Sequence, residues 1–178
     1  NIAINPNDDE LDKAVAIGIY LKKHVKGGPG LSLSSSRALK AMLGGKGGVC
    51  NDFAQVFNNF CVINDIRVKE WSCVERLFKS KYGHTFNEVW STRLDKWVAI
   101  DTSKALCFLD EHRVPLSVVE MFSRLRAGKA NQFHFYLDEP NRQLERLNLI
   151  YAARSIPFLT INYQNAKIDR FLDLFSGK

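Results

Sequence analysis

Three residues of this sequence have side chains that could act together in nucleophilic catalysis: Cys50, His84 and Asp101. A cysteine thiolate is a strong nucleophile, and a histidine beside it can hold the thiolate and carry its proton. A carboxylate bonded to the other ring nitrogen fixes the tautomer and the orientation of the histidine. The order cysteine, histidine, aspartate therefore predicts a catalytic triad, if the fold brings the three side chains together.

The stretch after Cys50 predicts a helix, over 51–64, with one buried face. Its apolar side chains recur at steps of three and four residues, the spacing of one side of an α-helix: Phe53, Val56, Phe57 and Phe60. Cys50 would then lie at the helix N-terminus, where free N–H groups and the helix dipole stabilise a thiolate. The preceding glycines, Gly47 and Gly48, allow the backbone to come close to a substrate carbonyl.

Two short segments predict strands that would carry the other two side chains. The first, 83–90, has His84 at its entry, and the second, 96–101, ends at Asp101. A hairpin turn separates them, and a further strand is expected before them, at 66–74. Consecutive strands behind one helix indicate an antiparallel sheet in an α+β arrangement.

The segment from about 32 to 102 resembles the transglutaminase-like superfamily, a circularly rearranged relative of the papain-like cysteine proteases. Three motifs in the family's order carry the resemblance: Gly48-Val49-Cys50-Asn51-Asp52-Phe53-Ala54, Gly83-His84-Thr85-Phe86-Asn87-Glu88-Val89-Trp90 and Trp97-Val98-Ala99-Ile100-Asp101. Residues 61–68 are similar to the family's helix end and its turn into the first strand. The resemblance implies a papain-like core, in which the nucleophile-bearing helix packs on an antiparallel sheet, with Cys50, His84 and Asp101 as the triad.

Each of these residues also has a purely structural interpretation. Cys50 could be a packed thiol, His84 a hydrogen-bonded strand residue, and Asp101 a turn carboxylate that caps the two residues after it. We favour the triad because the three residues occur together, within motifs that resemble one family. The other histidines lack such a context and are expected to be structural or on the surface: His24, His112 and His134.

The negative oxygen of a tetrahedral intermediate requires hydrogen-bond donors. The backbone N–H of Cys50 is the expected first donor, since it lies at a helix start. The resemblance implies a second donor from an upstream tryptophan, but all three tryptophans follow Cys50: Trp71, Trp90 and Trp97. This departure from the family pattern argues against efficient acyl transfer to a second amine. Asn51 and Asp52 are expected to cap the helix start rather than to line the site.

The reaction implied by the resemblance is acyl transfer through a thioester. Cys50 would attack an amide or ester carbonyl, His84 would protonate the leaving group, and water or an amine would resolve the thioester. Hydrolysis of a peptide or isopeptide amide is favoured over cross-linking by a transglutaminase, because the chain has only the minimal core and no calcium-binding cluster. Two alternatives stay open: an arylamine-type acyltransferase, and a catalytically silent module that binds a peptide or a glycan.

Neither a cofactor nor a metal is expected. The four cysteines form no CxxC pair, which argues against structural zinc, and free thiols mildly favour a reducing, cytoplasmic compartment. The glycine-rich stretch 44–48 resembles a phosphate loop but lacks the Gly-Lys-Ser/Thr ending. We expect it to be a flexible loop through which substrate approaches Cys50.

The composition is that of a globular protein. The chain has 178 residues, of which 46% are hydrophobic and 25% charged, and one domain over 1–178 is expected. No apolar run approaches the roughly 20 residues that cross a bilayer. The net charge of +6 comes from scattered basic residues without interleaved aromatics, which argues against a nucleic-acid partner. A peptide or protein substrate is expected from the reaction that the resemblance implies. Because the chain starts at Asn1 without a methionine, we expect it to be part of something longer.

Elements outside the three motifs complete the predicted α+β fold. Before the core, helices are expected up to about Lys26 and at 37–43. The part from 108 to 178 is predicted as a helical C-terminal elaboration that shapes one wall of the cleft. Its expected elements are helices at 115–127, 140–154 and 166–175 and short strands at 133–137 and 158–163.

Overall fold

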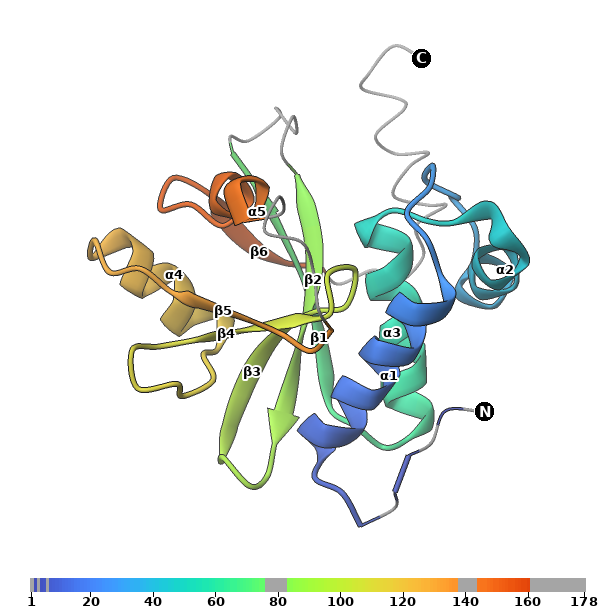
Figure 1. Ribbon diagram of the computed structural model, residues 1–178, viewed down its shortest axis with the longest axis horizontal. Helices are drawn as coiled ribbons and strands as arrows, with labels where there is room; N and C mark the ends of the chain where they lie inside the picture. The colour runs from blue at the N-terminus through green and yellow to red at the C-terminus, as the bar shows by residue number, and fades with distance from the viewer. Residues whose placement is uncertain (1, 3, 6, 76–82, 138–143, 161–178) are drawn as a thin grey trace.

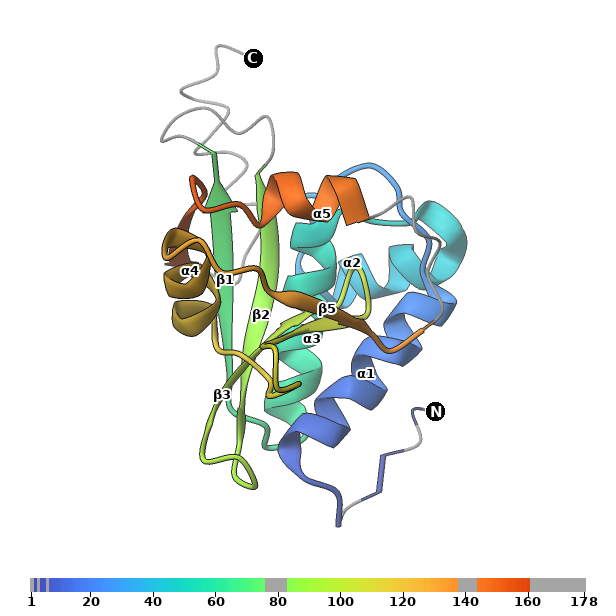
Figure 2. The ribbon, with the colours of Figure 1, turned by 60° about the vertical axis from the view of Figure 1, so that its left-hand side comes forward.

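The structure is a computed structural model, and it describes the chain apart from residues 1, 3, 6, 76–82, 138–143 and 161–178. Within the described residues, a six-stranded antiparallel sheet lies between two groups of helices (Figures 1 and 2). The helices that precede the first strand in the sequence cover one face, and those that lie between later strands in the sequence cover the other. This arrangement confirms the predicted α+β fold, with the helix that starts at Cys50 packed on an antiparallel sheet.

The elements are short, and their bounds are as follows. The helices are α1 (Glu10–His24), α2 (Ser35–Ala41), the π-helical turn η1 (Met42–Lys46), α3 (Cys50–Ile63), α4 (Val118–Arg126) and α5 (Leu144–Ile150). The strands, in the order in which they lie side by side, are β5 (Gln132–Phe135), β4 (Leu106–Leu109), β3 (Lys96–Asp101), β2 (His84–Ser91), β1 (Val68–Val74) and β6 (Ile156–Thr160).

Helix α3 forms where the apolar periodicity predicted a helix. Its periodic side chains Phe53, Val56 and Phe57 are buried, whereas Val62 and Ile63 at its end are exposed. The three buried side chains join a core that also contains residues from α1 and from one face of the sheet. A second core lies on the opposite face of the sheet, between the strands and helices α4 and α5. The central strands are therefore covered on both faces.

A buried polar network joins α3 to the two strands beneath it. Asn58 donates to a carboxyl oxygen of Glu70 on β1 at 2.7 Å, and Asn87 on β2 donates to the side-chain oxygen of Asn58 at 2.9 Å. Burial raises the pKa of Glu70 to about 8, which avoids an uncompensated charge in the core at neutral pH. Buried polar groups destabilise a fold unless they are hydrogen-bonded, so the network fixes the position of α3 on the sheet.

The C-terminal part adds strands as well as helices to the fold. The strand expected at 133–137 is β5, and the one expected at 158–163 is described as β6. These two strands form opposite edges of the sheet, and β6 pairs with β1. Strand β4 was not predicted. Residues 140–143 of the helix expected at 140–154 lie outside the described residues, and its expected end at 154 is wrong, since α5 ends at Ile150. The helix expected at 166–175 lies outside the described residues.

The expectation of a flexible loop at 44–48 is wrong for its first half, where the chain forms the turn η1. The turn directly continues α2 and ends at Lys46, and the next residue, Gly47, has a positive φ of 71°. Local periodicity could not show this, because a stretch of glycine and lysine carries no apolar pattern.

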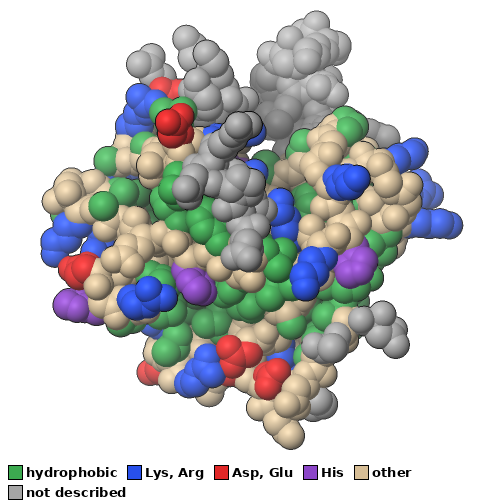
Figure 3. Space-filling model, viewed as in Figure 1, with side chains coloured by type: hydrophobic (Ala, Val, Ile, Leu, Met, Phe, Trp, Pro, Cys, Tyr) green, Lys and Arg blue, Asp and Glu red, His purple; other side chains and the backbone are tan. Residues whose placement is uncertain are grey.

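Basic side chains on the face seen in Figure 3 are distributed among hydrophobic and other polar groups. On this face they form no single large patch, in line with the scattered positions of lysine and arginine in the sequence. No helix in the described part of the chain is long and apolar enough to span a membrane.

Replacement of Phe57 by alanine tests how far α3 depends on the core. Because the Phe57 side chain is fully buried, Phe57→Ala is expected to lower the free energy of unfolding by about 3–5 kcal/mol, measured by urea denaturation. Val62→Ala on the same helix is the control. Its side chain is 65% exposed, so a change within about 0.5 kcal/mol is expected. Equal losses in the two variants would contradict the proposed packing.

Candidate active site

The three side chains predicted as a triad come from three elements that meet at one end of the sheet. Cys50 is the first residue of α3, His84 the first of β2 and Asp101 the last of β3. Since β2 and β3 are antiparallel neighbours, the start of one lies beside the end of the other. His84 Nε2 and Asp101 Oδ2 are 2.7 Å apart, and both side chains are buried. The structure thus brings His84 and Asp101 into direct contact.

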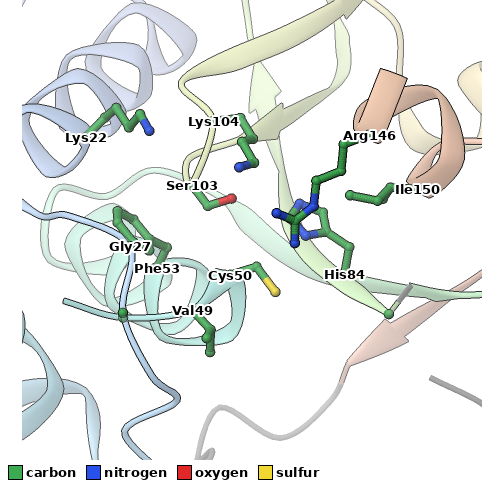
Figure 4. A pocket seen from close by; sticks show the side chains of 13 residues that line it. Lys22, Gly27, Val49, Cys50, Phe53, His84, Ser103, Lys104, Arg146 and Ile150 are labelled. Carbon is green, nitrogen blue, oxygen red and sulfur yellow. The ribbon is translucent and has the colours of Figure 1, made fainter. Parts of the chain in front are cut away.

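The thiol of Cys50 lies on the other side of the imidazole. Nε2 of His84 is engaged by Asp101, which leaves Nδ1 as the ring nitrogen available to the thiol. Burial raises the pKa of Cys50, but a hydrogen bond with His84 and the charge of its ring outweigh burial, so that the pKa lies below its ordinary value. The backbone N–H of Thr85 also donates to the sulfur and lowers the pKa further. In Figure 4 the Cys50 sulfur points into the cleft that His84 also lines.

The charge of Asp101 governs the protonation of His84. Burial alone would lower the pKa of His84, but the Asp101 carboxylate and its hydrogen bond raise it to about 10. Burial would raise the pKa of Asp101, and the charge and hydrogen bond of His84 lower it instead. The buried pair therefore favours an imidazolium beside Cys50, and a positively charged ring is what stabilises a cysteine thiolate.

Asp101 is held by more donors than His84 alone. Its Oδ1 accepts hydrogen bonds from the Ser103 hydroxyl at 2.7 Å and from the backbone N–H of Lys104 at 3.2 Å. Its Oδ2 accepts from the Tyr151 hydroxyl at 3.0 Å in addition to His84. Both oxygens are thus satisfied although the side chain has no exposed surface.

Tyr151 is a site residue that the sequence analysis missed. It follows α5, and its ring meets those of His84 and Phe108 edge-on, with centroids 5.7 and 4.7 Å away. In the sequence Tyr151 only continued the apolar face of a predicted helix. Its hydroxyl partner lies 50 positions earlier, and no local spacing connects the two.

Two pairs of glycines set the position of Cys50. The backbones of Gly27 and Gly48 form a parallel bridge, and the N–H of Gly28 donates to the carbonyl of Gly48 at 3.0 Å. A Cβ on Gly28 would lie 2.5 Å from the carbonyl oxygen of Lys46, so only glycine fits there. The segment after α1 therefore packs directly against the residues that lead into α3.

Asp52 caps the start of α3, as expected. One of its carboxylate oxygens accepts from the N–H of Val49 at 3.0 Å and from that of Leu31 at 3.2 Å. The amide oxygen of Asn51 accepts from the Thr85 hydroxyl at 2.7 Å, which ties the helix start to β2. The N–H of Cys50, at the first position of the helix, has no acceptor within the helix and is available to a substrate oxygen.

A cleft of about 410 Å³ opens beside Cys50 and His84. Its walls come from α1, from the glycine segments, from the turn after β3 and from α5 (Figure 4). Arg146 and Ile150 of α5 line it, in line with the expectation that the C-terminal part shapes one wall. None of the three tryptophans is among the residues that line it. Trp90 and Trp97 instead pack edge-on against each other across β2 and β3.

The remaining cysteines and histidines lie outside this cleft. All four cysteines are free, and burial raises the pKa of the three others: Cys61, Cys73 and Cys107. His24 is bonded to the carbonyl of Tyr20, and neither His112 nor His134 lines the cleft. No group of three or more side chains that could hold a metal ion occurs among the described residues.

The lowered pKa of Cys50 predicts selective alkylation. At pH 6, iodoacetamide is expected to modify Cys50 faster than the other three cysteines, because only Cys50 has a pKa below its ordinary value. His84→Ala removes the hydrogen bond and the charge that oppose burial, so the rate at Cys50 should fall at least about ten-fold. Peptide mass spectrometry over a pH series measures each rate. Equal rates at all four cysteines would refute the thiolate–imidazolium pair.

The hydroxyl of Tyr151 predicts an effect on acid stability. Tyr151→Phe removes one donor to buried Asp101 and should lower the free energy of unfolding at pH 7 by about 1–3 kcal/mol. Because the folded pKa of Asp101 is lowered, its contribution to stability is present above the unfolded pKa and is lost as the pH falls through the folded pKa. The variant raises that folded pKa, so its total loss of stability on acidification should be smaller than that of the wild type and should be complete at a higher pH.

Tyr20→Phe is the matched control for this measurement. Tyr20 is half-buried in α1, and its ring stacks on His24 away from the cleft. Its replacement should change the unfolding free energy by no more than about 0.5 kcal/mol at any pH. If Tyr151→Phe behaved in the same way, the hydrogen bond to Asp101 would have no energetic role.

Comparison with known proteins identifies the family. A model of the transglutaminase-like superfamily matches residues 2–102, which includes every element from α1 to β3. No curated protein and no solved structure matches the chain. The match contains Cys50, His84 and Asp101 and ends before Arg146 and Tyr151. Because the family model covers more than half of the chain, the protein belongs to the transglutaminase-like superfamily.

Proposed function

We propose that this protein is a thiol-dependent acyl-transfer enzyme in which Cys50, His84 and Asp101 act as the catalytic triad. The observation that carries the proposal is the contact of 2.7 Å between His84 and a fully buried Asp101, beside a cysteine whose pKa is lowered. A purely structural histidine would not need a buried carboxylate on one side and a partly exposed thiol on the other. Membership of the superfamily fits this reaction class.

In the first half of the reaction the thiolate of Cys50 attacks the carbonyl carbon of an amide or ester. The negative oxygen of the tetrahedral intermediate is stabilised by the N–H of Cys50 and by the N-terminal end of the α3 dipole. His84 then gives its proton from Nδ1 to the leaving amine or alcohol, and the carbon–nitrogen or carbon–oxygen bond breaks. The acyl group remains on Cys50 as a thioester.

In the second half a nucleophile removes the acyl group. His84 accepts a proton from water, which attacks the thioester, and the thiolate leaves with the pair of electrons from the carbon–sulfur bond. The products are a carboxylic acid and the restored thiolate–imidazolium pair. Asp101 stays ionised throughout and orients the ring, while Tyr151 and Ser103 hold Asp101 as positioning residues.

We favour hydrolysis of a peptide or isopeptide amide over transfer to an amine. A transferase must exclude water and present a second substrate, and this chain lacks the upstream tryptophan that the family resemblance implies. A transglutaminase or arylamine-type activity is the alternative within the same chemistry. A silent binding module is the alternative from another class, and it would be expected to lack a member of the triad.

The proposal predicts an acyl-enzyme at one residue. Incubation with p-nitrophenyl acetate should release a burst of p-nitrophenol and leave one acetyl group on the Cys50 peptide, detected by mass spectrometry. Cys50→Ala should abolish both signals, whereas Cys107→Ala, at a buried thiol outside the cleft, should retain them. Asp101→Asn should slow the burst by about 10²–10⁴, since the ring loses its orienting anion.

The same assay separates hydrolysis from transfer. Addition of glycinamide as an acceptor should leave acetate as the main product if water resolves the thioester. Acetylglycinamide as the main product would instead establish a transferase. An acetyl group on a residue other than Cys50, with no signal from the Cys50 peptide, would overturn the assignment of the nucleophile and favour the binding module.

A further inference from the structure

The cleft beside Cys50 carries charge of one sign. Of the residues that line it, three have basic side chains: Lys22 on α1, Lys104 in the turn after β3 and Arg146 on α5. No aspartate or glutamate is among the lining residues of the described chain. The three cations come from separate parts of the sequence, so the cationic lining arises from the fold and not from one charge run.

Two of the three cations project toward the position where a substrate would react. In Figure 4 the Arg146 guanidinium extends from α5 toward His84 and Cys50, and the Lys104 side chain projects toward the same region from the turn beside Ser103. Arg146 is exposed and takes part in no ion pair among the described residues. The nearby carboxylate, Asp101, is fully buried and already accepts four hydrogen bonds. Among the described residues, neither Asp101 nor any other carboxylate therefore forms an ion pair with the guanidinium.

A partly enclosed cleft with charge of one sign concentrates ligands of the opposite charge. Guanidinium and ammonium groups bind carboxylates and phosphates through charge-assisted hydrogen bonds, and arginine can bind them with two parallel bonds. A volume of about 410 Å³ lies within the range of sites for small molecules or a short peptide segment. The lining thus suits an anionic group that belongs to the reacting part of a substrate.

We propose that the acyl substrate carries a carboxylate or phosphate group near the carbonyl that Cys50 attacks, and that Arg146 and Lys104 bind this group. The inference rests on the proposed function, because it concerns the substrate of the same site. Arg146 lies outside the part of the chain that the family model matches, so the preference belongs to the C-terminal part of this chain.

A pair of alkylating reagents tests the charge of the cleft directly. Iodoacetate and iodoacetamide attack the same thiolate and have nearly the same size, but only iodoacetate is an anion. The readout is the ratio of their rate constants at Cys50, from peptide mass spectrometry at low salt. Both reagents react only with the thiolate. A variant that changes the fraction of thiolate therefore changes both rate constants by the same factor and leaves their ratio unchanged. The imidazolium of His84 also attracts iodoacetate, so the decisive comparison is between variants.

Arg146→Gln and Lys104→Gln are each expected to lower the iodoacetate-to-iodoacetamide ratio about three-fold, and the difference from wild type should fade in high salt. The matched controls are Arg113→Gln and Lys129→Gln, which remove the same charges from exposed positions outside the cleft. The controls should retain the wild-type ratio. An unchanged ratio in both cleft variants, or equal losses in the controls, would overturn the proposal.

The iodoacetamide rate alone distinguishes this proposal from the proposed function. If wild-type Cys50 reacts slowly with iodoacetamide at pH 6, the thiolate is absent and the proposed function fails. If Cys50 reacts fast and the cleft variants keep the wild-type ratio, the proposed function stands and only the preference for an anion fails.

Protection by small ligands identifies the anionic group. N-acetylglycine, inorganic phosphate and the neutral N-acetylglycinamide are compared, at equal ionic strength, as protectors of Cys50 against iodoacetamide. At least one anion should give half-protection at a concentration at least about five-fold below that of the amide, and Arg146→Gln should remove the difference. Protection by N-acetylglycine identifies a carboxylate and protection by phosphate a phosphate group. Equal protection by all three compounds would overturn the proposal.

Discussion

The burial of one carboxylate is the constraint on which the rest of this structure depends. Asp101 has no exposed surface, and a buried charge is strongly destabilising unless it is paired and hydrogen-bonded. Its partners come from three regions of the chain: His84 from β2, Ser103 and Lys104 from the turn after β3, and Tyr151 from the C-terminal part. The buried carboxylate of Asp101 is therefore stable only when these three regions are assembled around it.

The state of the proposed nucleophile follows from the same charge. Asp101 raises the pKa of His84, and the protonated ring in turn lowers that of Cys50 against the effect of burial. Position matters as much as charge, because the thiol must meet the imidazole from another element. The close backbone packing of the glycine pairs and the hydrogen bonds of Asp52 fix the start of α3, which carries the thiol. The charge of Asp101 thus acts on the pKa of the Cys50 thiol, and the backbone packing determines where its sulfur lies.

The part of the fold that depends on local pattern could be predicted from the sequence. The periodic phenylalanines located α3, and three motifs in order placed Cys50 on a helix start and His84 and Asp101 on neighbouring strands. Long-range contacts could not be predicted. Tyr151 bonds to a residue 50 positions earlier, and the partners of Asn58 lie on β1 and β2. The spacing of residue types along the sequence indicates neither set of contacts, since only the folded sheet brings these residues together.

Helix α5 and the residue after it link the proposed triad to the proposed preference for an anionic substrate. The short segment that carries Tyr151 to Asp101 also carries Arg146 and Ile150 to the wall of the cleft. A change at Arg146 would alter the charge that an incoming ligand meets while Tyr151 still holds the buried carboxylate. The two roles are separable because they fall on different sides of the segment, one in the core and one exposed. If Cys50, His84 and Asp101 act as proposed, the charge of the substrate they accept is therefore open to change through residues outside 2–102.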